Sequence, residues 1–206
     1  MTENFRPTVL RNRALEALKG NWGMAATAGL IYLVICAIPI LWFSSAVWVV
    51  YLFDWLVVAP IGVGSYFLFW DVLKGKEVNL RTMFEAFSQY GRYLTFLLLV
   101  FIYIFLWSLL LIVPGIIKGF SYAMSYYIMR DHPDMNGEQA ICRSMEMMKG
   151  HKMDLFLLAL SFIGWSLLSI LTLGIGLIWL IPYILTAYAA FYDTLKKEYE
   201  AKNTAA

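Results

Sequence analysis

The chain has 206 residues, of which 61% are apolar and 15% are charged, whereas soluble domains carry about 25% charged residues. Uncharged runs cover residues 22–53, 55–70, 93–117, 119–129 and 155–192, and several exceed the ~20 residues that cross a bilayer as a helix. This composition excludes a soluble domain, a disordered tail, a nucleic-acid reader and a disulfide-stapled secreted module. It indicates a polytopic membrane protein.

Apolar segments follow one another along the chain. They cover residues 22–43, 47–70, 93–113, 115–129, 155–173 and 175–192. Ser44-Ser45 separates the first two, Pro114-Gly115 is a pair typical of turns, and a turn is expected at residues 172–176. Segment 115–129 would be about 22 Å long as a helix, shorter than the ~30 Å hydrocarbon core. It therefore either spans fully or is re-entrant.

The basic residues fix the expected topology. All Lys and Arg except Lys118 lie in the N-terminal segment, in the loops around residues 74–92 and 130–152, and in the tail. Because Lys and Arg concentrate in cytoplasmic loops, the chain returns to the same side after each apolar block. We therefore predict an all-α bundle of six spans arranged as three hairpins, with both termini cytoplasmic.

An internal repeat is predicted from short matching patterns. Residues 16–20 and 146–150 share Glu-x-x-Lys-Gly, while the middle copy at 85–91 has two extra residues. The inward spans end alike, with a Tyr five residues before an Asp: Tyr66 and Asp71, Tyr126 and Asp131, Tyr188 and Asp193. These patterns favour one membrane domain of three tandem units, 8–71, 79–131 and 136–193, followed by a flexible tail at 194–206.

Each unit begins with an amphipathic segment. Leu10, Ala14, Ala17 and Leu18 share one helical face in the first segment. In the second, Asn79 is a candidate N-cap, with Leu80, Phe84 and Phe87 on one side. In the third, Asn136 and Gln139 have the spacing of a capping box, and Ile141, Met145 and Met148 form the apolar face. Such helices lie in the headgroup plane or pack on the bundle as cytoplasmic helices. Docking of a soluble partner on the Met-rich face is a further alternative.

Two charged residues lie within apolar segments, where charge is costly and points to function. Asp54 and Lys118 fall at similar depth near the outer ends of the six-span arrangement, so they are a candidate intramembrane pair. The alternatives are that both side chains snorkel to the outer headgroups, or that they serve transport.

A candidate polar helix face comprises Ser121, Ser125 and Tyr126. Small and hydroxylated residues let membrane helices pack closely and form hydrogen bonds to one another, so we favour packing. The alternative is that this face lines a polar pathway.

The sequence assigns no catalytic residue, no metal site and no cofactor. Cys36 and Cys142 are separated by the expected topology, and no phosphate-binding loop follows a strand. Asp71, Asp131, Asp154 and Asp193 lie at cytoplasmic ends, where we expect solvated helix caps.

Several stretches resemble a known family. Residues 140–152, 155–165 and 171–183, together with Val113-Pro-Gly-Ile-Ile-Lys118, are similar to the bacterial membrane proteins grouped as domain of unknown function 975. A looser likeness is to the membrane domain attached to some glycerophosphodiester phosphodiesterases. The resemblance implies a bacterial cytoplasmic (inner) membrane and brings no established activity or catalytic residue.

The function expected from these features is a non-catalytic membrane interaction or scaffold module. It would bind membrane lipid, a second copy of itself or a partner membrane protein, and no nucleic acid. The alternative is a small transporter or channel component, since Pro60, Pro114 and Pro182 could break spans. An enzyme is the third option.

Overall fold

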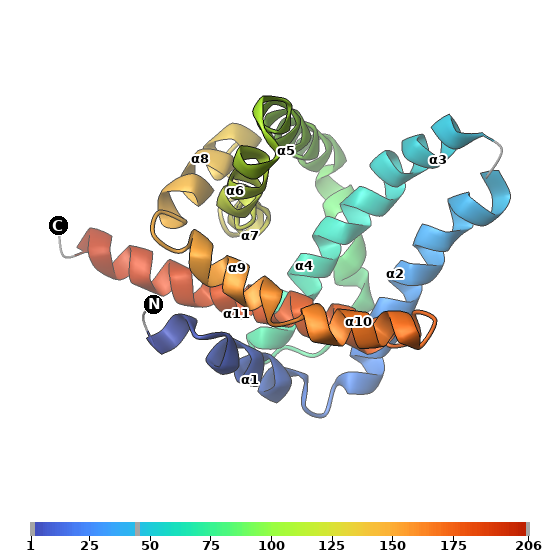
Figure 1. Cartoon of the computed structure of the whole chain (residues 1–206), viewed down its shortest axis with the longest axis horizontal. Helices are drawn as coiled ribbons and strands as arrows, with labels where there is room; N and C mark the ends of the chain where they lie inside the picture. Colours follow the sequence, from blue (N-terminus) through green and yellow to red (C-terminus); the bar gives the residue numbers. More distant parts are fainter. Residues whose placement is uncertain (1–2, 44–45, 205–206) are drawn as a thin grey trace.

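A computed structural model describes residues 3–43 and 46–204, and every regular element within them is a helix (Figure 1). The predicted break at Ser44-Ser45 lies outside the described residues. In chain order the elements are η1 (Glu3–Phe5), α1 (Pro7–Leu18), α2 (Trp22–Phe43), α3 (Val47–Phe53), η2 (Asp54–Val58), α4 (Ala59–Leu73), η3 (Leu80–Gln89), α5 (Tyr90–Leu110), α6 (Ile112–Tyr122), α7 (Ser125–Asp131), α8 (Gly137–Met147), α9 (Lys152–Leu160), α10 (Ile163–Leu171) and α11 (Leu177–Thr204). The predicted all-α class is confirmed.

Five helical stretches in the described residues are long and apolar enough to cross a bilayer. They are Trp22–Trp42, Val47–Leu73, Leu80–Leu109, Lys152–Leu171 and Leu177–Thr204. Helices suit such sequences because a helix satisfies its own backbone hydrogen bonds where no water is present. These stretches mark the chain as a membrane protein.

The segment predicted as the fourth span consists of two short helices. Helix α5 ends at Leu110, and the extended backbone of Leu111 (φ −164°, ψ 149°) starts α6 three residues before Pro114. The turn predicted at Pro114-Gly115 is therefore wrong. Pro114 is tolerated inside the first turn of α6, because a helix makes no internal hydrogen bond with its first N–H groups. A turn at 123–124 separates α6 from α7.

Pro60 explains the irregular middle of the second apolar stretch. A proline lacks the N–H that would bond the carbonyl four residues earlier, and the chain just before Pro60 widens into the π-helix η2. The carbonyl of Leu56 accepts a hydrogen bond from Tyr90 Oη instead, at 2.9 Å. The first and second units are thus tied together where the helix is interrupted.

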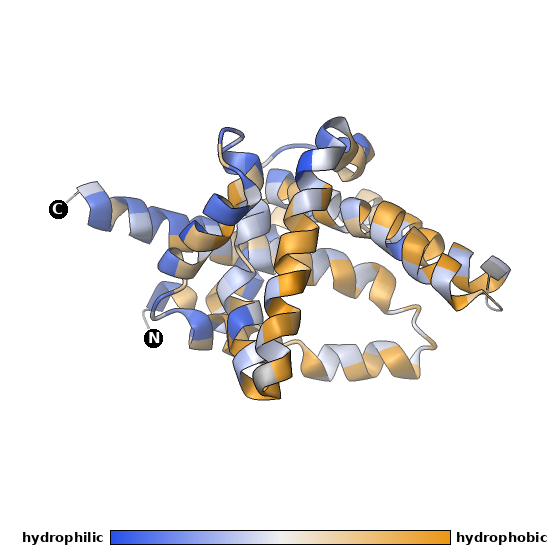
Figure 2. Ribbon diagram, turned by 90° about the horizontal axis from the view of Figure 1, so that it is seen from above, coloured by the Kyte–Doolittle hydropathy of each residue, from blue (hydrophilic) through white to orange (hydrophobic). Residues whose placement is uncertain are grey.

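Three helical arms diverge from one base. The arms are α2–α4, α5–α7 and α9–α11, and the base consists of α1, η3, α8 and the arm ends next to them (Figure 1). Hydrophilic residues concentrate in the part of the molecule that carries both termini, whereas the arms are largely apolar (Figure 2). The core is in the base, where Leu10, Phe67, Met129 and Tyr192 are almost completely buried. At the far end of an arm, Leu173 is 95% exposed.

The amphipathic segments are helices that pack on this base. In α1, Leu10, Ala14 and Leu18 are buried, and Ala17 is half-buried. The capping box of α8 is confirmed, because Asn136 N donates to Gln139 Oε1 at 2.9 Å and Gln139 N donates to Asn136 Oδ1 at 2.8 Å.

The second amphipathic segment has a different buried face from the one predicted. Asn79 caps it as expected, its Oδ1 accepting from the Arg81 amide at 3.1 Å. However, η3 is a 3-10 helix, which has three residues per turn, so residues three apart share a face. Met83 and Ala86 are therefore buried, while Phe84 and Phe87 remain 45% and 36% exposed.

The C-terminal residues extend α11 rather than forming the expected flexible tail. The helix continues to Thr204. Pairs one turn apart support it, including Lys197 with Asp193 at 3.0 Å and Lys202 with Glu198 at 2.5 Å. His151 also contacts Glu198 at 3.3 Å, which holds this extension against the start of α9.

Candidate functional site

Asp71, at the end of α4, is the first member of a set of ion pairs in the base. Its carboxylate accepts from Arg130 Nη2 of α7 at 2.7 Å and from Lys76 Nζ at 2.9 Å. Arg130 also pairs with Glu85 of η3 at 2.8 Å and donates to the Phe67 carbonyl at 3.0 Å. This guanidinium thus connects α7, α4 and η3.

Asp131 and Asp193 have equivalent partners. Asp131, at the end of α7, accepts from Lys196 Nζ and, at 3.0 Å, from Tyr192 Oη, both of α11. Asp193 of α11 accepts from Arg13 Nη2 of α1 at 2.8 Å. Sequence reasoning expected solvated helix caps here, whereas these carboxylates are only slightly exposed and are paired with cations from other helices.

The three pairs form a series that begins and ends on helices of the first unit, α4 and α1, and we name it the inner-end ring. The Asp of α4 binds a cation of α7, the Asp of α7 binds a cation of α11, and the Asp of α11 binds a cation of α1. Each of the three arms is therefore linked to another through the inner end. The sequence identifies the three Asp residues by their spacing, but it gives no signal for Arg13, Arg130 and Lys196 as partners.

Lys74 adds a further cation beside this ring. Its Nζ lies 3.5 Å from the centre of the Trp70 ring. Burial lowers the pKa of the Lys74 ammonium from its ordinary value, because the charged form is less well solvated there. Asp131 and Asp71 partly offset this effect.

Two tyrosines of the repeat pattern, Tyr66 and Tyr126, belong to an aromatic cluster that reaches the ring through Tyr192. Tyr66 stacks on Tyr126 with ring centres 5.1 Å apart and meets Tyr127 edge-on at 5.7 Å. Tyr127 in turn stacks on Tyr192 at 4.9 Å. Tyr188 is partly buried against the same core. Such aromatic pairs stabilise the contact between arms beyond the area that they bury.

The predicted polar helix face takes part in packing. Ser121 Oγ donates to the Ile117 carbonyl at 2.8 Å, and Ser125 Oγ donates to the Tyr122 carbonyl. The Ser121 carbonyl accepts from Ser144 Oγ of α8, also at 2.8 Å. The Ser121 hydroxyl thus bonds within α6, the Ser125 hydroxyl bonds from the start of α7 to the end of α6, and the face contacts α8.

The structure does not bring Asp54 and Lys118 together. Lys118 Nζ lies 4.5 Å from the centre of the Trp107 ring and 3.9 Å from Met145 Sδ of α8. Asp54 lines a hollow beside α5, and among the described residues no ion pair joins it to Lys118. Lys118 therefore lies beside the amphipathic helix α8 and not next to Asp54.

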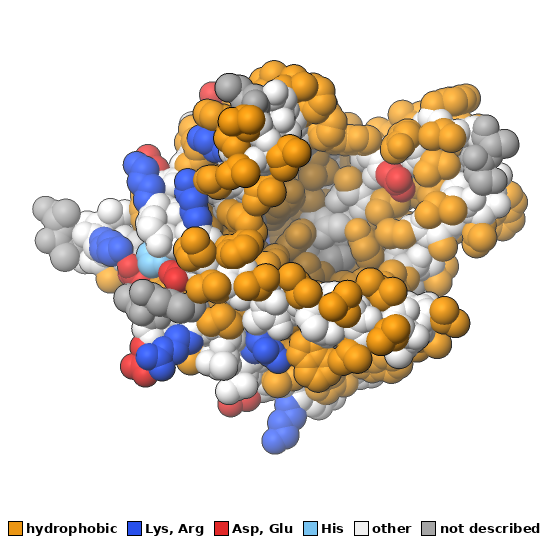
Figure 3. Space-filling view, in the orientation of Figure 1, with side chains coloured by type: hydrophobic (Ala, Val, Ile, Leu, Met, Phe, Trp, Pro, Cys, Tyr) orange, Lys and Arg blue, Asp and Glu red, His pale blue; other side chains and the backbone are white. Residues whose placement is uncertain are grey.

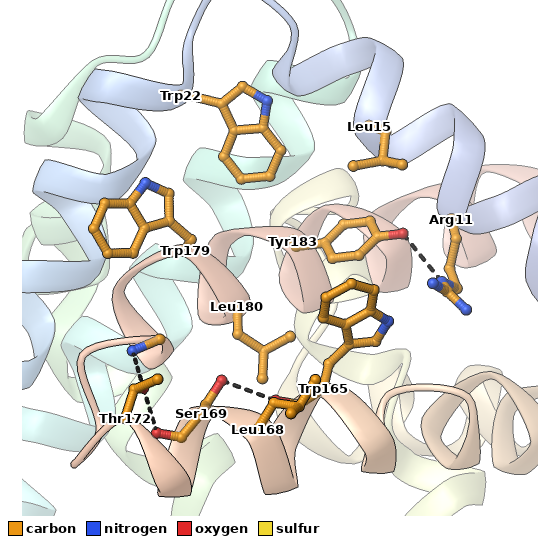
Figure 4. Close-up of a pocket in the computed structure, with 11 residues that line it drawn as sticks. Arg11, Leu15, Trp22, Trp165, Leu168, Ser169, Thr172, Trp179, Leu180 and Tyr183 are labelled. Carbon is orange, nitrogen blue, oxygen red and sulfur yellow. Dashed lines mark hydrogen bonds between the residues drawn. The ribbon is translucent and has the colours of Figure 1, made fainter.

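Two largely apolar hollows lie where arms meet, and Figure 3 shows apolar side chains around the space between the arms. The first, about 350 Å³, lies between the first and second arms and includes Trp55, Leu97 and Phe101. The second, about 450 Å³, lies between α1, the start of α2, α10 and α11, and we name it the α1–α11 groove (Figure 4). Its lining residues are Arg11, Leu15, Trp22, Trp165, Leu168, Ser169, Thr172, Gly176, Trp179, Leu180 and Tyr183.

Comparison with known proteins gives one family. Residues 109–199 match the model of a family described as protein of unknown function (DUF975). No curated protein and no solved structure matches the chain. The matched region begins in the last residues of α5, includes α6 to α10 completely and ends at Tyr199 of α11. The looser likeness to a glycerophosphodiester phosphodiesterase membrane domain stays a prediction. The resemblance to domain of unknown function 975 is therefore confirmed over residues 109–199, a little under half of the chain.

Proposed function

We propose that the chain is a non-catalytic membrane module of three hairpins, in which α6 and α7 together form the fourth span. Both termini, the inner-end ring and the amphipathic helices α1, η3 and α8 lie on the cytoplasmic side of a bacterial inner membrane. Support comes from the basic residues, nearly all of which belong to the base. The exposed Phe84 and Phe87 of η3 suit a helix that touches the headgroup region.

The module binds membrane lipid between its arms. The observation that carries this proposal is the low burial of the apolar helices: in four of the five long apolar stretches, only 22–28% of the most apolar window is buried within the protein. Side chains of this kind need apolar surroundings, and the arms are too far apart at their ends to supply them to one another (Figure 1). The hollows at the arm junctions are candidate binding sites for lipid acyl chains.

Lipid is favoured over the other occupants that the sequence leaves open. A second copy or a partner protein would need a broad complementary surface, whereas the hollows lie inside junctions of one chain. The transporter alternative would need polar groups free to line a path, and the hydroxyls of Ser121 and Ser125 already donate to nearby backbone carbonyls.

The proposal is tested by purifying the full chain in a mild detergent and measuring its mass and its retained phospholipid. We expect a defined number of lipids per chain after detergent exchange, and a higher melting temperature when lipid is added back. Leu97→Gln, in the hollow between the first two arms, should lower the retained number. Leu98→Gln, on the neighbouring exposed face, should not. The proposal would be contradicted if the purified chain retained no lipid and its melting temperature did not change when lipid was added.

A further inference from the structure

Arg11 stands at one end of the α1–α11 groove with most of its hydrogen-bonding capacity unused. Its Nε donates to Tyr183 Oη at 3.0 Å, and its guanidinium carbon lies 5.5 Å from the centre of the Phe162 ring (Figure 4). In the described part of the chain it forms no ion pair, and its Nη atoms have no hydrogen-bond partner. Arg13, one half-turn on, is by contrast held by Asp193, Thr194 and the Ala190 carbonyl.

These contacts leave the guanidinium of Arg11 able to bind an anion. A guanidinium has five N–H donors in a fixed plane, and the Tyr183 bond takes only one of them. The two Nη groups form the fork that binds phosphate or carboxylate through two parallel hydrogen bonds. Since the cation is half-buried beside aromatic rings, it gains more from an anionic partner than a fully solvated arginine would.

The rest of the groove suits a hydrocarbon chain. Its walls carry Trp22, Trp165 and Trp179, and between residues 172 and 165 it runs for about 10 Å along α10. The two aliphatic hydroxyls in it are already bound, Ser169 Oγ donating to the Trp165 carbonyl and Thr172 Oγ1 donating to the Ser169 carbonyl. The walls belong to helices long and apolar enough to cross a bilayer, so a lipid chain has direct access.

We propose that the α1–α11 groove binds one anionic phospholipid, with its phosphate on the Nη groups of Arg11 and one acyl chain along Trp165, Leu168 and Trp179. A cation at one end of an apolar slot complements a molecule that is anionic at one end and apolar along its length. This inference rests on the proposed lipid binding and gives it a specific site and headgroup charge.

The test uses the full chain in mild detergent, titrated with phosphatidylglycerol or with phosphatidylcholine of the same acyl chains, and binding is read by native mass spectrometry. The wild-type chain should bind phosphatidylglycerol more tightly. Arg11→Gln should weaken phosphatidylglycerol binding about tenfold, the loss expected for a charge-assisted hydrogen bond, and should abolish the preference. Arg6→Gln, on the same polar segment with an exposed side chain, should keep it.

A second pair of variants tests the acyl-chain part without touching the charge. Leu168→Trp narrows the groove and should weaken both lipids, whereas Leu167→Trp, equally exposed but outside the lining, should behave as wild type. This pair keeps the test open if Arg11→Gln does not fold, since Leu168 and Leu167 are 55% and 58% exposed. If Arg11→Gln retains lipid and still prefers phosphatidylglycerol, the proposed site is wrong, but the proposal of a lipid-binding module is not contradicted. A wild-type chain that retains no lipid overturns both.

Discussion

Arg130 joins three elements of the base through side-chain contacts that no short sequence pattern predicts. It pairs with Asp71 and Glu85 and donates to a backbone carbonyl of α4, while its own side chain is only 16% exposed. Ion pairs on the surface contribute little, but removing one partner of a buried pair leaves an uncompensated charge. The repeat spacing could identify Asp71, Asp131 and Asp193. Their partners could not be identified, because each comes from a helix distant in sequence.

Replacing Arg130 should therefore destabilise the fold. For Arg130→Gln we expect a loss of about 2–3 kcal/mol in the free energy of unfolding, since Asp71 and Glu85 then lose a shared cation. The measurement is denaturant unfolding in a fixed detergent. Lys202→Gln is the control, because its pair with Glu198 is exposed on the lysine side, and it should change stability by less than about 0.5 kcal/mol. An Arg130→Gln chain as stable as wild type would show that the ring does not hold the base.

At the scale of elements, glycine sets how closely the first arm approaches the second amphipathic helix. A Cβ on Gly64 of α4 would lie 1.9 Å from the Met83 carbonyl oxygen of η3, which is backbone and cannot rotate away. The sequence predicts both helices but not this approach. It predicted the α8 capping box correctly, because both partners lie within four residues. It misplaced the η3 face, because a ten-residue 3-10 helix does not follow the 3.6-residue period.

Gly64→Ala should force α4 and η3 apart. We expect a loss of about 1–3 kcal/mol in unfolding free energy, the usual cost of overpacking. Gly119→Ala in α6 is the matched control, since a Cβ there meets no atom within 4 Å. It should leave stability unchanged or raise it by up to about 1 kcal/mol. Equal melting temperatures for the two variants would contradict the close contact of α4 with η3.

The cap of α8 gives a milder test at the same scale. Asn136→Ala removes the side-chain acceptor for the Gln139 amide and should cost about 1 kcal/mol. Local amide exchange at residues 137–140 should rise more than exchange in α7, because only the first turn of α8 loses its partner. Unchanged exchange in that turn would show that the packing of α8 alone holds its start.

For the whole molecule, the sequence predicts helical class, the order of apolar segments and the polar segments that lie together at the base. The first apolar helix begins and ends where expected, at Trp22 and Phe43. The turn before Pro114 and the divergence of the three arms were not foreseen. The turn depends on local backbone conformation, and the divergence of the arms depends on packing between distant segments. Neither can be predicted from hydropathy and charge. The α1–α11 groove was missed for the same reason, since its lining comes from both ends of the chain.

The most direct test of the account is the sidedness of its connectors. With Cys36 and Cys142 replaced by serine, single cysteines at Val47, Leu173, Lys76, Lys149 or Lys202 are exposed to an impermeant maleimide added outside intact cells. The three-hairpin arrangement predicts labelling at Val47 and Leu173, and labelling at Lys76, Lys149 and Lys202 only after the membrane is opened. Labelling of Lys76 or Lys149 from outside, or of Lys202 on the opposite side from them, would contradict it.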